Sequence, residues 1–407
     1  MKIAILTMGT RGDVQPFAVL GQALQQRGHE VTFSTARNFE SLVQSYGLRF
    51  APIDADFQAV LNSKEGKKLL KANPLVIRRN LNKWIYPMVE QSLNTFFRLA
   101  KQNDKTIYHV KTMADYFADQ MPGKMIRAMV VPAVQPTQDF ANPAFSGFRI
   151  YKFLNRMSYQ LNNIGYRLMK KPIVRFRKAN GLPEKYVIPE TPFIYGISSI
   201  FLKQPTDYPS QSWFTGFWIG HSADMLSPEL SNFLQSGTPT LLFTFGSMPF
   251  KCKFDIQQAL INLTERFGIR IILIKGWGFE QTERLKDNDR ITVIDSAPYD
   301  KLLPLVRAVV HHGGLGTTAA CLAAGKPFWI SPVFYPVGDQ FFWGKVSWQM
   351  GVSPKPIPLS RLSEAQFIVS IAELLQNKQL YYNAETMAKK LDEEDGISTA
   401  VRLIETL

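Results

Sequence analysis

Residues suited to holding an anion gather in one stretch of the chain, from Ala308 to Gln340. A short apolar run ends in two histidines and leads into a glycine-rich turn with two threonines: His311, His312, Gly313, Gly314, Gly316, Thr317 and Thr318. Glycines let a backbone approach a ligand closely, and the free N–H groups that open a helix attract phosphate. The stretch therefore predicts a phosphate site, with a plain strand-to-helix turn as the simpler alternative.

A carboxylate and an amide, Asp339 and Gln340, follow the next apolar run. Both side chains can form paired hydrogen bonds with the hydroxyl groups of a sugar. Beside a phosphate site they favour a sugar phosphate as the ligand. On its own, such a pair would be interpreted as the ordinary polar residues of a surface loop.

A second candidate for chemistry is Asp13, in the loop Gly9-Thr10-Arg11-Gly12-Asp13. As a helix cap it would be structural. As an acid–base group it is the sole carboxylate or imidazole between Met1 and Gly28. An aspartate with a pKa of about 4 is a weak base for an alcohol. It can serve if proton transfer comes late in the reaction, and we expect partial burial to raise its pKa.

The elements that must position these residues alternate as strand and helix. Strands are expected at 2–8, 31–35, 48–52, 105–110, 125–132, 239–245, 269–274, 290–294, 306–310 and 328–333, and a further apolar run spans 191–201. Such alternation predicts an α/β fold with doubly wound parallel sheets, whose loops after the strands form the sites. The loop after the first strand lacks the dinucleotide fingerprint G-x-G-x-x-G, so NAD is not expected.

The composition limits the class of protein. With 407 residues, 45% of them hydrophobic, the chain is long enough for two globular domains. No run of eighteen apolar residues occurs, so a membrane-spanning helix is not expected. Two distant cysteines, Cys252 and Cys321, and five histidines without zinc-ligand spacing predict neither a disulfide framework nor a metal site. They fit a reduced, cytoplasmic location.

The net charge of +14 is concentrated in two stretches. Residues 64–101 hold nine Lys and Arg against two Glu, and residues 149–185 hold ten against one. A surface of one sign attracts anionic lipid head groups, an acidic substrate or nucleic acid. No nucleic-acid-binding motif accompanies the charge, so nucleic acid is not an expected partner. A basic amphipathic stretch would suit peripheral contact with an anionic membrane surface.

The stretch HHGGLGTTAACLAAGKP, followed by PVGDQFFWGKV and GVSPKPIP, resembles the donor site of family-one glycosyltransferases with the GT-B fold. The subgroup it resembles most comprises sterol glucosyltransferases and bacterial enzymes acting on antibiotics, flavonoids or terpenoids. The resemblance implies two Rossmann-like domains facing each other across a cleft. They are an acceptor-binding domain (1–202), a linker (203–220) and a nucleotide-sugar-binding domain (221–390), and a final helix (391–407) packs back on the first domain.

The resemblance also assigns roles to residues of the C-terminal domain. It implies that the histidine and glycine turn, with Gly246-Ser247, holds the diphosphate, that Asp339 and Gln340 hold the hexose, and that Trp277 or Tyr299 stacks on the base. The expected donor-binding residues are Gly246, Ser247, Trp277, Ala297, Pro298, Tyr299, His312, Gly313, Gly314, Gly316, Thr317, Thr318, Asp339 and Gln340.

In the N-terminal domain the resemblance makes Asp13 the general base. Its neighbours in the loop would meet the acceptor, and aromatic residues of the variable middle region would contact the acceptor's apolar body. The expected acceptor-binding residues are Thr10, Arg11, Gly12, Trp84, Phe140 and Phe145. For any one of these aromatic residues, a place in an ordinary helix core is an equally good interpretation.

The expected activity is inverting transfer of a hexose, glucose first, from a UDP- or TDP-sugar to a hydroxyl of a small hydrophobic acceptor. No cofactor or metal is expected, because an imidazole and helix amides take a cation's place at the phosphates. Alternatives are an epimerase or phosphorylase, a catalytically silent GT-B protein that binds a partner, and a peripheral membrane enzyme glycosylating a lipid. The Asp13 loop disfavours the first, the intact set of polar site residues disfavours the second, and the basic stretches favour the third.

Overall fold

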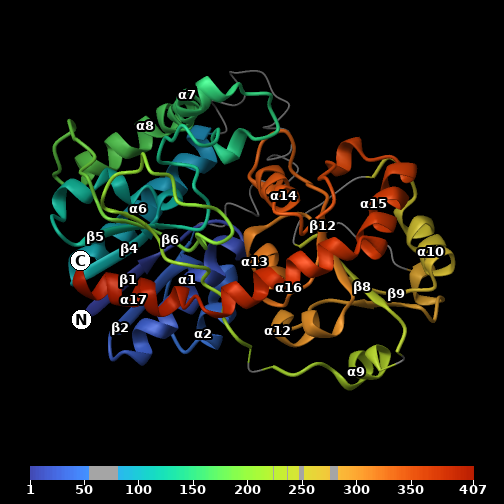
Figure 1. Ribbon diagram of the computed structural model, residues 1–407. Coiled ribbons are helices and arrows are strands. Elements are labelled where there is room, and N and C mark those ends of the chain that lie inside the picture. The colour runs from blue at the N-terminus through green and yellow to red at the C-terminus, as the bar shows by residue number, and fades with distance from the viewer. Residues whose placement is uncertain (55–80, 223, 236, 247–251, 276–282) are drawn as a thin grey trace.

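The computed structural model describes residues 1–54, 81–222, 224–235, 237–246, 252–275 and 283–407. Two parallel β-sheets with flanking helices lie side by side in the molecule, the first in blue and teal and the second in yellow and orange (Figure 1). The two parallel-sheet α/β units that the sequence predicts are confirmed.

The first sheet has seven strands in the order β3-β2-β1-β4-β5-β6-β7, and every neighbouring pair is parallel. The order reverses between β1 and β4, so successive connections leave the middle of the sheet in opposite directions. The strands are β1 (Lys2–Leu6), β2 (Glu30–Ala36), β3 (Arg49–Ile53), β4 (Lys105–His109), β5 (Met125–Met129), β6 (Phe193–Tyr195) and β7 (Ser212–Phe214).

The second sheet repeats this plan with five parallel strands in the order β10-β9-β8-β11-β12. Its order reverses between β8 and β11. The strands are β8 (Thr240–Thr244), β9 (Arg270–Ile274), β10 (Ile291–Ile294), β11 (Ala308–His311) and β12 (Phe328–Ile330).

Helices cover the sheets, so the central strands are apolar on both faces. Every residue of β8 and β11 is buried, as expected for a parallel strand between two helical layers. The helices are α1 (Arg11–Gln26), α2 (Glu40–Ser45), α6 (Tyr86–Gln102), α7 (Asn155–Ser158), α8 (Asn162–Ala179), α9 (Pro228–Leu234), α10 (Ile256–Phe267), α11 (Glu283–Lys286), α12 (Tyr299–Leu302), α13 (Leu315–Ala323), α14 (Gln340–Gln349), α15 (Glu364–Gln376), α16 (Lys378–Asp392) and α17 (Gly396–Thr406).

The segment 203–220 differs from its prediction as a linker. Residues Ser212–Phe214 form β7, the edge strand of the first sheet, paired with β6. The strand has three residues and follows a proline-rich loop, so its sequence carries too little alternation to indicate a strand. The crossing to the second sheet therefore begins only after Phe214.

The chain crosses between the two halves a second time near its C-terminus, where α17 packs against α1. Arg27 and His29 of the first half bind the Glu405 carboxylate at 3.0 and 3.1 Å. The two crossings touch each other, because a Cβ on Gly216 would lie 2.6 Å from Gly396 Cα. Glycine at both positions lets the two backbones meet.

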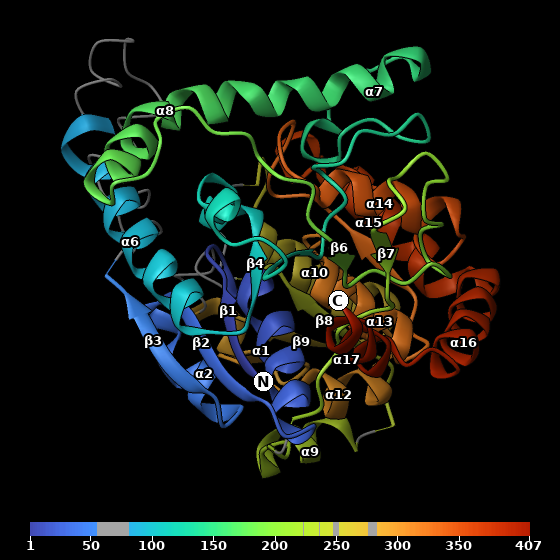
Figure 2. The ribbon, with the colours of Figure 1, turned by 90° about the vertical axis from the view of Figure 1, so that its left-hand side faces the viewer.

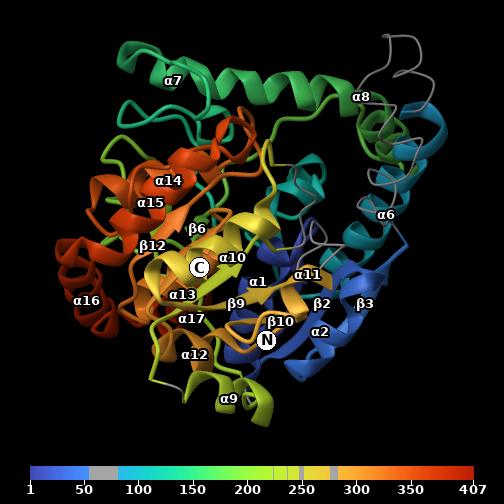
Figure 3. The ribbon, with the colours of Figure 1, turned by 90° about the vertical axis from the view of Figure 1, so that its right-hand side faces the viewer.

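The segment from Lys152 to Ala179 forms one helical rod at the upper edge of the molecule (Figures 2 and 3). It contains α7 and α8, joined by the 3-10 turn Tyr159–Leu161. The end of α8 packs on α6 through buried Ile173 and Phe176. No helix in the described part of the chain combines the length and the apolar character needed to cross a bilayer.

A buried guanidinium fastens the end of α8 to the first sheet's loops. The Arg177 side chain is fully buried, and it donates to both carboxylate oxygens of Asp119 at 2.9 and 2.8 Å and to the Tyr116 carbonyl at 2.7 Å. These bonds to Arg177 hold the pKa of Asp119 below its ordinary value. A buried charge of this kind depends on its partner, because it has no water to replace it.

We predict that Asp119→Asn lowers the free energy of unfolding by about 3–5 kcal/mol, since it leaves the Arg177 charge uncompensated. Urea denaturation at pH 7 measures it. Because the folded pKa of Asp119 is lowered, the difference from wild type should be complete above the ordinary pKa of 3.8 and vanish as the pH falls through the folded value.

The matched control is Glu90→Gln, which breaks the half-exposed Arg175–Glu90 pair on the same helix, at 3.3 Å. An exposed pair contributes about 0–1 kcal/mol, so this variant should stay close to wild type. Equal losses in the two variants would contradict the role given to the buried pair.

Candidate active site

The first half of the site forms where β1 ends. Asp13 lies in the first turn of α1, and its Oδ2 accepts hydrogen bonds from the Thr10 backbone N–H at 2.8 Å and the Thr10 hydroxyl at 3.2 Å. Thr10 is the N-cap of α1, so the helix start and the carboxylate fix each other. Gly9 is required here, because a Cβ would collide with the Asp13 carboxylate.

The end of β4 supplies two further side chains. Lys111 Nζ lies 2.7 Å from Asp13 Oδ1, and His109 Nε2 lies 3.6 Å from the same oxygen. His109 Nδ1 accepts a hydrogen bond from the Lys111 backbone N–H at 3.0 Å. A neutral imidazole carries its proton on the other nitrogen, so His109 presents Nε2–H to Asp13. His109 is therefore placed as a donor to the carboxylate.

The charges around Asp13 decide its protonation. Burial, the largest single influence, raises its pKa, but the Lys111 ammonium and the hydrogen bonds from Lys111 and Thr10 together bring the pKa below its ordinary value. Burial lowers the pKa of His109 to about 4, so this imidazole is neutral at pH 7. The expected net rise of the Asp13 pKa is wrong: burial does raise it, but the expectation left out Lys111, which helps to bring the pKa below its ordinary value. At neutral pH, Asp13 is a carboxylate.

The second half of the site forms where β8 and β11 end. His312 follows β11, and its ring fits between two glycines. A Cβ on Gly246 would lie 3.0 Å from His312 Cε1, and one on Gly314 would lie 2.7 Å from His312 Nε2. Burial lowers the pKa of His312 to about 4, so the ring is a neutral hydrogen-bonding group at pH 7. Gly246 and Gly314 thus serve the placement of His312.

The glycine turn opens helix α13, with Gly314 as N-cap. Gly313 has a φ of +96°, and a Cβ on it would lie 2.9 Å from the Gln340 carbonyl oxygen. Gly316 is exposed, and no atom lies within 4 Å of where its Cβ would be. Packing therefore does not require glycine at 316. The close approach of a ligand to the start of the helix would require it.

The two threonines of this turn have different surroundings. Thr318 is fully buried, and its hydroxyl donates to the Gly314 carbonyl at 3.0 Å, so its side chain serves the helix rather than an open surface. Thr317 is half-buried and hydrogen-bonds the Tyr299 hydroxyl, which also contacts the Thr244 hydroxyl at 3.0 Å. Tyr299 thus links β8, α12 and α13.

Asp339 and Gln340 lie at the start of α14. Asp339 Oδ2 accepts from the Trp343 indole N–H at 2.9 Å. Gln340 is buried, and its side-chain oxygen accepts from the backbone N–H groups of Val333 and Phe334 at 2.8 and 2.9 Å. The side-chain amide oxygen of Gln340 therefore holds the backbone of the loop before α14. Asp339, next to it in the chain, is half-buried.

The two halves face the same space, because α1 of the first packs against α13 of the second, and charges of one half act on groups of the other. Burial raises the pKa of Asp339, the Trp343 bond and the Lys111 ammonium oppose the rise, and the Asp13 charge adds to it. Arg11 likewise acts on the pKa of Tyr299. Charges shift a pKa in this way only from nearby. The loops after β1 and β4 therefore meet the loops of the second half across the domain boundary.

A direct contact between loops closes one side of this boundary. The Gly338 N–H donates to the Ala144 carbonyl at 2.8 Å, and the Gly147 N–H donates to the Pro336 carbonyl at 3.2 Å. A Cβ on Gly147 would lie 2.5 Å from Pro336, so glycine allows the loops to meet. The loop that leads to Asp339 is thus held by the first domain.

The predicted site residues are only partly brought together. Thr10, Arg11 and Gly12 lie beside Asp13, as the sequence requires. Phe140 packs on Phe342 of α14, with ring centres 5.2 Å apart, and Phe145 lies half-buried in the loop that meets the second domain. Both aromatic residues thus belong to the domain boundary.

Trp84 has a different position from the other predicted acceptor residues. It is 46% exposed, with Lys83 Nζ 4.9 Å from its ring centre. In the described residues nothing links it to Asp13. Two predicted donor residues, Ser247 and Trp277, lie outside the described residues, while Ala297 and Pro298 precede Tyr299 and are half-buried.

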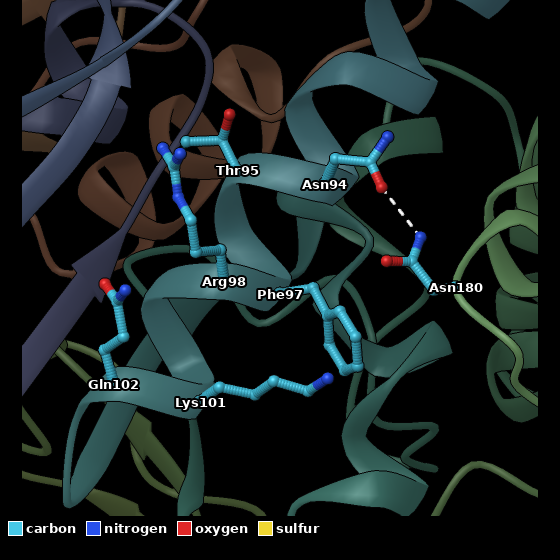
Figure 4. A pocket seen from close by; sticks show the side chains of 7 residues that line it. All are labelled: Asn94, Thr95, Phe97, Arg98, Lys101, Gln102 and Asn180. Carbon is cyan, nitrogen blue, oxygen red and sulfur yellow. Dashed lines mark hydrogen bonds between the residues drawn. The ribbon is translucent and has the colours of Figure 1, made fainter.

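A hollow of about 540 Å³ lies on α6, away from these loops (Figure 4). Across it, the Asn180 amide donates to the Asn94 side chain at 2.7 Å. Lys101 Nζ lies 4.1 Å from the Phe97 ring centre. None of its lining residues comes from the ends of β1, β4, β8 or β11, so it is separate from the candidate site.

Comparison with known proteins decides the family. Over 98% of its length the chain is 31% identical to a sterol 3-beta-glucosyltransferase of Arabidopsis thaliana, 67% of which it covers. The chain belongs to the GT-B glycosyltransferases. The glycosyltransferase family 28 N-terminal domain also matches residues 3–114, which include the Asp13, His109 and Lys111 cluster.

Other glycosyltransferases agree with this assignment. The chain is 29% identical to the O-mycaminosyltylonolide 6-deoxyallosyltransferase of Streptomyces fradiae, with 100% of the chain and 97% of that enzyme covered. It covers 30% of the sterol 3-beta-glucosyltransferase of Aspergillus terreus, at 28% identity. Among solved structures, the glycosyltransferase of kitacinnamycin has the same fold, with a TM-score of 0.74 at 16% identity over 100% and 98% of the two chains.

Sequence reasoning missed two residues of this candidate site, His109 and Lys111. A usable signal existed, because both follow the predicted strand at 105–110. In a doubly wound sheet, the strand after the first β-α-β-α-β run pairs with the first strand on its free side. Its end therefore lies beside the Asp13 loop.

We predict that Lys111→Met moves the acid limb of the pH–rate profile for sugar transfer to higher pH. Without the ammonium, burial becomes the dominant influence and raises the Asp13 pKa, so the carboxylate is lost at a higher pH. The measurement is kcat/KM from pH 4 upward. Lys105→Met is the control, since Lys105 lies at the other end of β4 and binds the Gly123 carbonyl. An unchanged acid limb in Lys111→Met would show that Asp13 does not govern it.

We predict opposite effects of Gly316→Ala on stability and on donor binding. Alanine has space and helix propensity there, so the free energy of unfolding should rise by about 0.5–1 kcal/mol. The affinity for a nucleoside diphosphate should fall about tenfold if the turn contacts the phosphates. Gly165→Ala in α8 is matched, as its Cβ also meets open space, and it should change stability alone. Unchanged calorimetric affinity in Gly316→Ala would exclude the turn from the phosphate site.

Proposed function

We propose that this glycosyltransferase moves a hexose, with glucose the first to test, from a UDP- or TDP-sugar to a hydroxyl of a small hydrophobic acceptor. The observation that carries the proposal is that the first domain meets the second beside both candidate carboxylates: α1, which holds Asp13, packs on α13, and the Gly338 N–H next to Asp339 donates to the Ala144 carbonyl at 2.8 Å. This arrangement supports a single site in which Asp13 is the ionised base and the Asp339 carboxylate binds hydroxyl groups of the sugar. The names of the Arabidopsis and Streptomyces relatives, a sterol glucosyltransferase and a macrolide-type deoxyallosyltransferase, support a hydrophobic acceptor.

The reaction we propose is a single displacement with inversion at the anomeric carbon. The acceptor oxygen approaches from the side of the first domain and forms the new bond to that carbon. The bond from the carbon to the phosphate oxygen breaks, and its electron pair leaves with the nucleoside diphosphate. The acceptor's proton passes to Asp13. Attack and departure from opposite domains give the in-line geometry that inversion needs.

Asp13 suits a late proton transfer. Its lowered pKa keeps it ionised but makes it a weak base for a free alcohol. The hydroxyl becomes acidic only as its oxygen bonds to the sugar, so Asp13 accepts the proton near the end of the step. An acceptor hydroxyl bound to Asp13 Oδ1 competes with Lys111 Nζ for that oxygen. Lys111 is half-exposed on a flexible side chain, so it can yield the position.

The leaving diphosphate meets neutral donors in this proposal. His312 is neutral at pH 7, and the helix start at Gly314–Gly316 adds backbone N–H groups. Such preorganised donors stabilise developing negative charge. The nucleotide sugar is a co-substrate, and these groups take the place of a cation at the phosphates.

A membrane lipid is a second candidate acceptor, and one observation favours it. The basic stretch at 149–178 forms an exposed helical rod with apolar side chains on its outer face. A peripheral enzyme at an anionic membrane would use the same chemistry at Asp13 on a different acceptor.

The test is nucleoside diphosphate release from a panel of UDP- and TDP-sugars with pooled sterols, flavonoids and glycolipids. Acceptor-dependent release should fall about 10²–10⁴-fold in Asp13→Asn, because the base is lost while the shape is kept. Asp104→Asn, at an exposed carboxylate that accepts from the Lys2 N–H, is the control and should match wild type.

Release that persists in Asp13→Asn at the wild-type rate would refute the assignment of the base. The product's anomeric configuration, read by NMR, checks the stereochemistry. A retained configuration would refute the single displacement.

A further inference from the structure

The rod from Lys152 to Ala179 has an inner face that is hydrogen-bonded to the body of the protein. The Asn155 amide donates to the Gln138 carbonyl at 2.8 Å, and the Asn162 amide donates to the Ala133 carbonyl at 2.9 Å. Ser158 Oγ accepts from the Asn142 N–H at 2.8 Å. The spacing of these residues places them on one side of a helix. The side that faces the protein is therefore polar in the first half of the rod.

The opposite side of the rod is apolar and open. Five side chains recur at intervals of three or four residues and form a stripe, which we call the docking face: Phe153, Met157, Leu161, Ile164 and Leu168. At 100° per residue this stripe lies opposite the bonded inner face. Phe153 is 81% exposed, Ile164 60% and Met157 58%. The polarity of this helix is thus inverted relative to a helix that packs on a core.

Exposed apolar side chains are concentrated here. Seven of the nineteen large apolar side chains that are exposed in the described part of the chain lie within residues 148–168. Single exposed apolar residues need no explanation, but a contiguous group on one face marks an interaction surface. Among the residues that the structure describes, no packing partner accounts for this stripe.

Basic side chains accompany the docking face. Residues 149–178 contain nine Lys and Arg and no acidic residue. Lys152, Arg167 and Lys170 are exposed on the same rod. Arg177 alone is buried with a carboxylate. The surface therefore combines an apolar stripe with positive charge, which is the pattern of helices that lie in the interface of an anionic bilayer.

We propose that the docking face binds an anionic lipid bilayer, with α7 and α8 lying in the plane of its head groups. The charge argues against a second copy of the chain as the occupant, because two such faces would bring like charges together. It equally favours acidic lipid over neutral lipid. Docking requires no nucleotide sugar and no catalysis.

The docking face is connected to the domain boundary. On the opposite side of the same rod, Ser158 is hydrogen-bonded to Asn142. The loop that follows Asn142 contacts Pro336 and Gly338, which precede Asp339 in the chain. Phe148 and Val337 on these two contacting loops are 49% and 52% exposed. Bilayer contact would therefore lie beside the loop of Asp339. That the bilayer delivers the acceptor to Asp13 rests on the proposed function.

The experiment is vesicle co-flotation of the full chain, without nucleotide sugar. Vesicles of phosphatidylcholine mixed with phosphatidylglycerol are compared with pure phosphatidylcholine. We expect binding to the anionic vesicles only, weakening as salt rises. Phe153→Ser/Met157→Ser/Ile164→Ser and Lys152→Gln/Arg167→Gln/Lys170→Gln should each lower the partition coefficient more than about tenfold.

The matched control is Val369→Ser/Tyr382→Ser, which removes two apolar side chains that are each 65% exposed on the second domain. It should bind vesicles like wild type. The unfolding temperature of every variant is measured, so that a loss of binding is assigned only to folded protein.

Three outcomes would overturn the proposal. These are no wild-type binding to anionic vesicles at low salt, equal binding by the docking-face variants, or a dimer in sedimentation velocity that the docking-face variants abolish while vesicles stay unbound. Asp13→Asn must still bind vesicles, so a failed catalytic assignment and a failed docking surface give different results.

Discussion

The site depends on the reversal of strand order in each parallel sheet. Where the order reverses, neighbouring strands send their connections to opposite faces, and the loops at their carboxyl ends enclose a crevice. The first sheet reverses between β1 and β4 and the second between β8 and β11. Asp13, Lys111 and His312 follow three of these four strands, β1, β4 and β11. The two domains differ in what they place there: a carboxylate with a lysine and a histidine in one, and a histidine between two glycines in the other.

Burial and pairing compete at each ionisable group of the site. Burial alone would leave Asp13 protonated more readily, and Lys111 reverses that outcome. At Asp339 the Trp343 hydrogen bond and the Lys111 ammonium oppose burial without overcoming it, so the pKa of Asp339 is raised. The two imidazoles nearest the chemistry, His109 and His312, are neutral because burial is not offset. One carboxylate is thus kept ready to take a proton while the surrounding rings act as neutral hydrogen-bonding groups.

The sequence indicates local structure better than it indicates which distant residues lie in contact. Strands and glycine turns such as Gly313–Gly316 are visible because their signals are contiguous in the chain. The partnership of Asp13 with Lys111 joins residues far apart in sequence, and only the strand order brings them together. The shift in the Asp13 pKa depends on that partnership, so its sign could not be obtained from the loop alone. Phe140 shows the same limit, since its partner Phe342 belongs to the other domain.

The contact between Gly216 and Gly396 has a mechanical consequence. The polypeptide passes from one domain to the other twice, and the two passages touch at these glycines. Two adjacent passages define an axis, and rotation about that axis changes the width of the domain boundary without stretching either passage. Sliding or twisting of one domain over the other would pull the passages apart. Any rotation of one domain against the other would therefore pivot near these two glycines, where both passages hold the domains at one spacing.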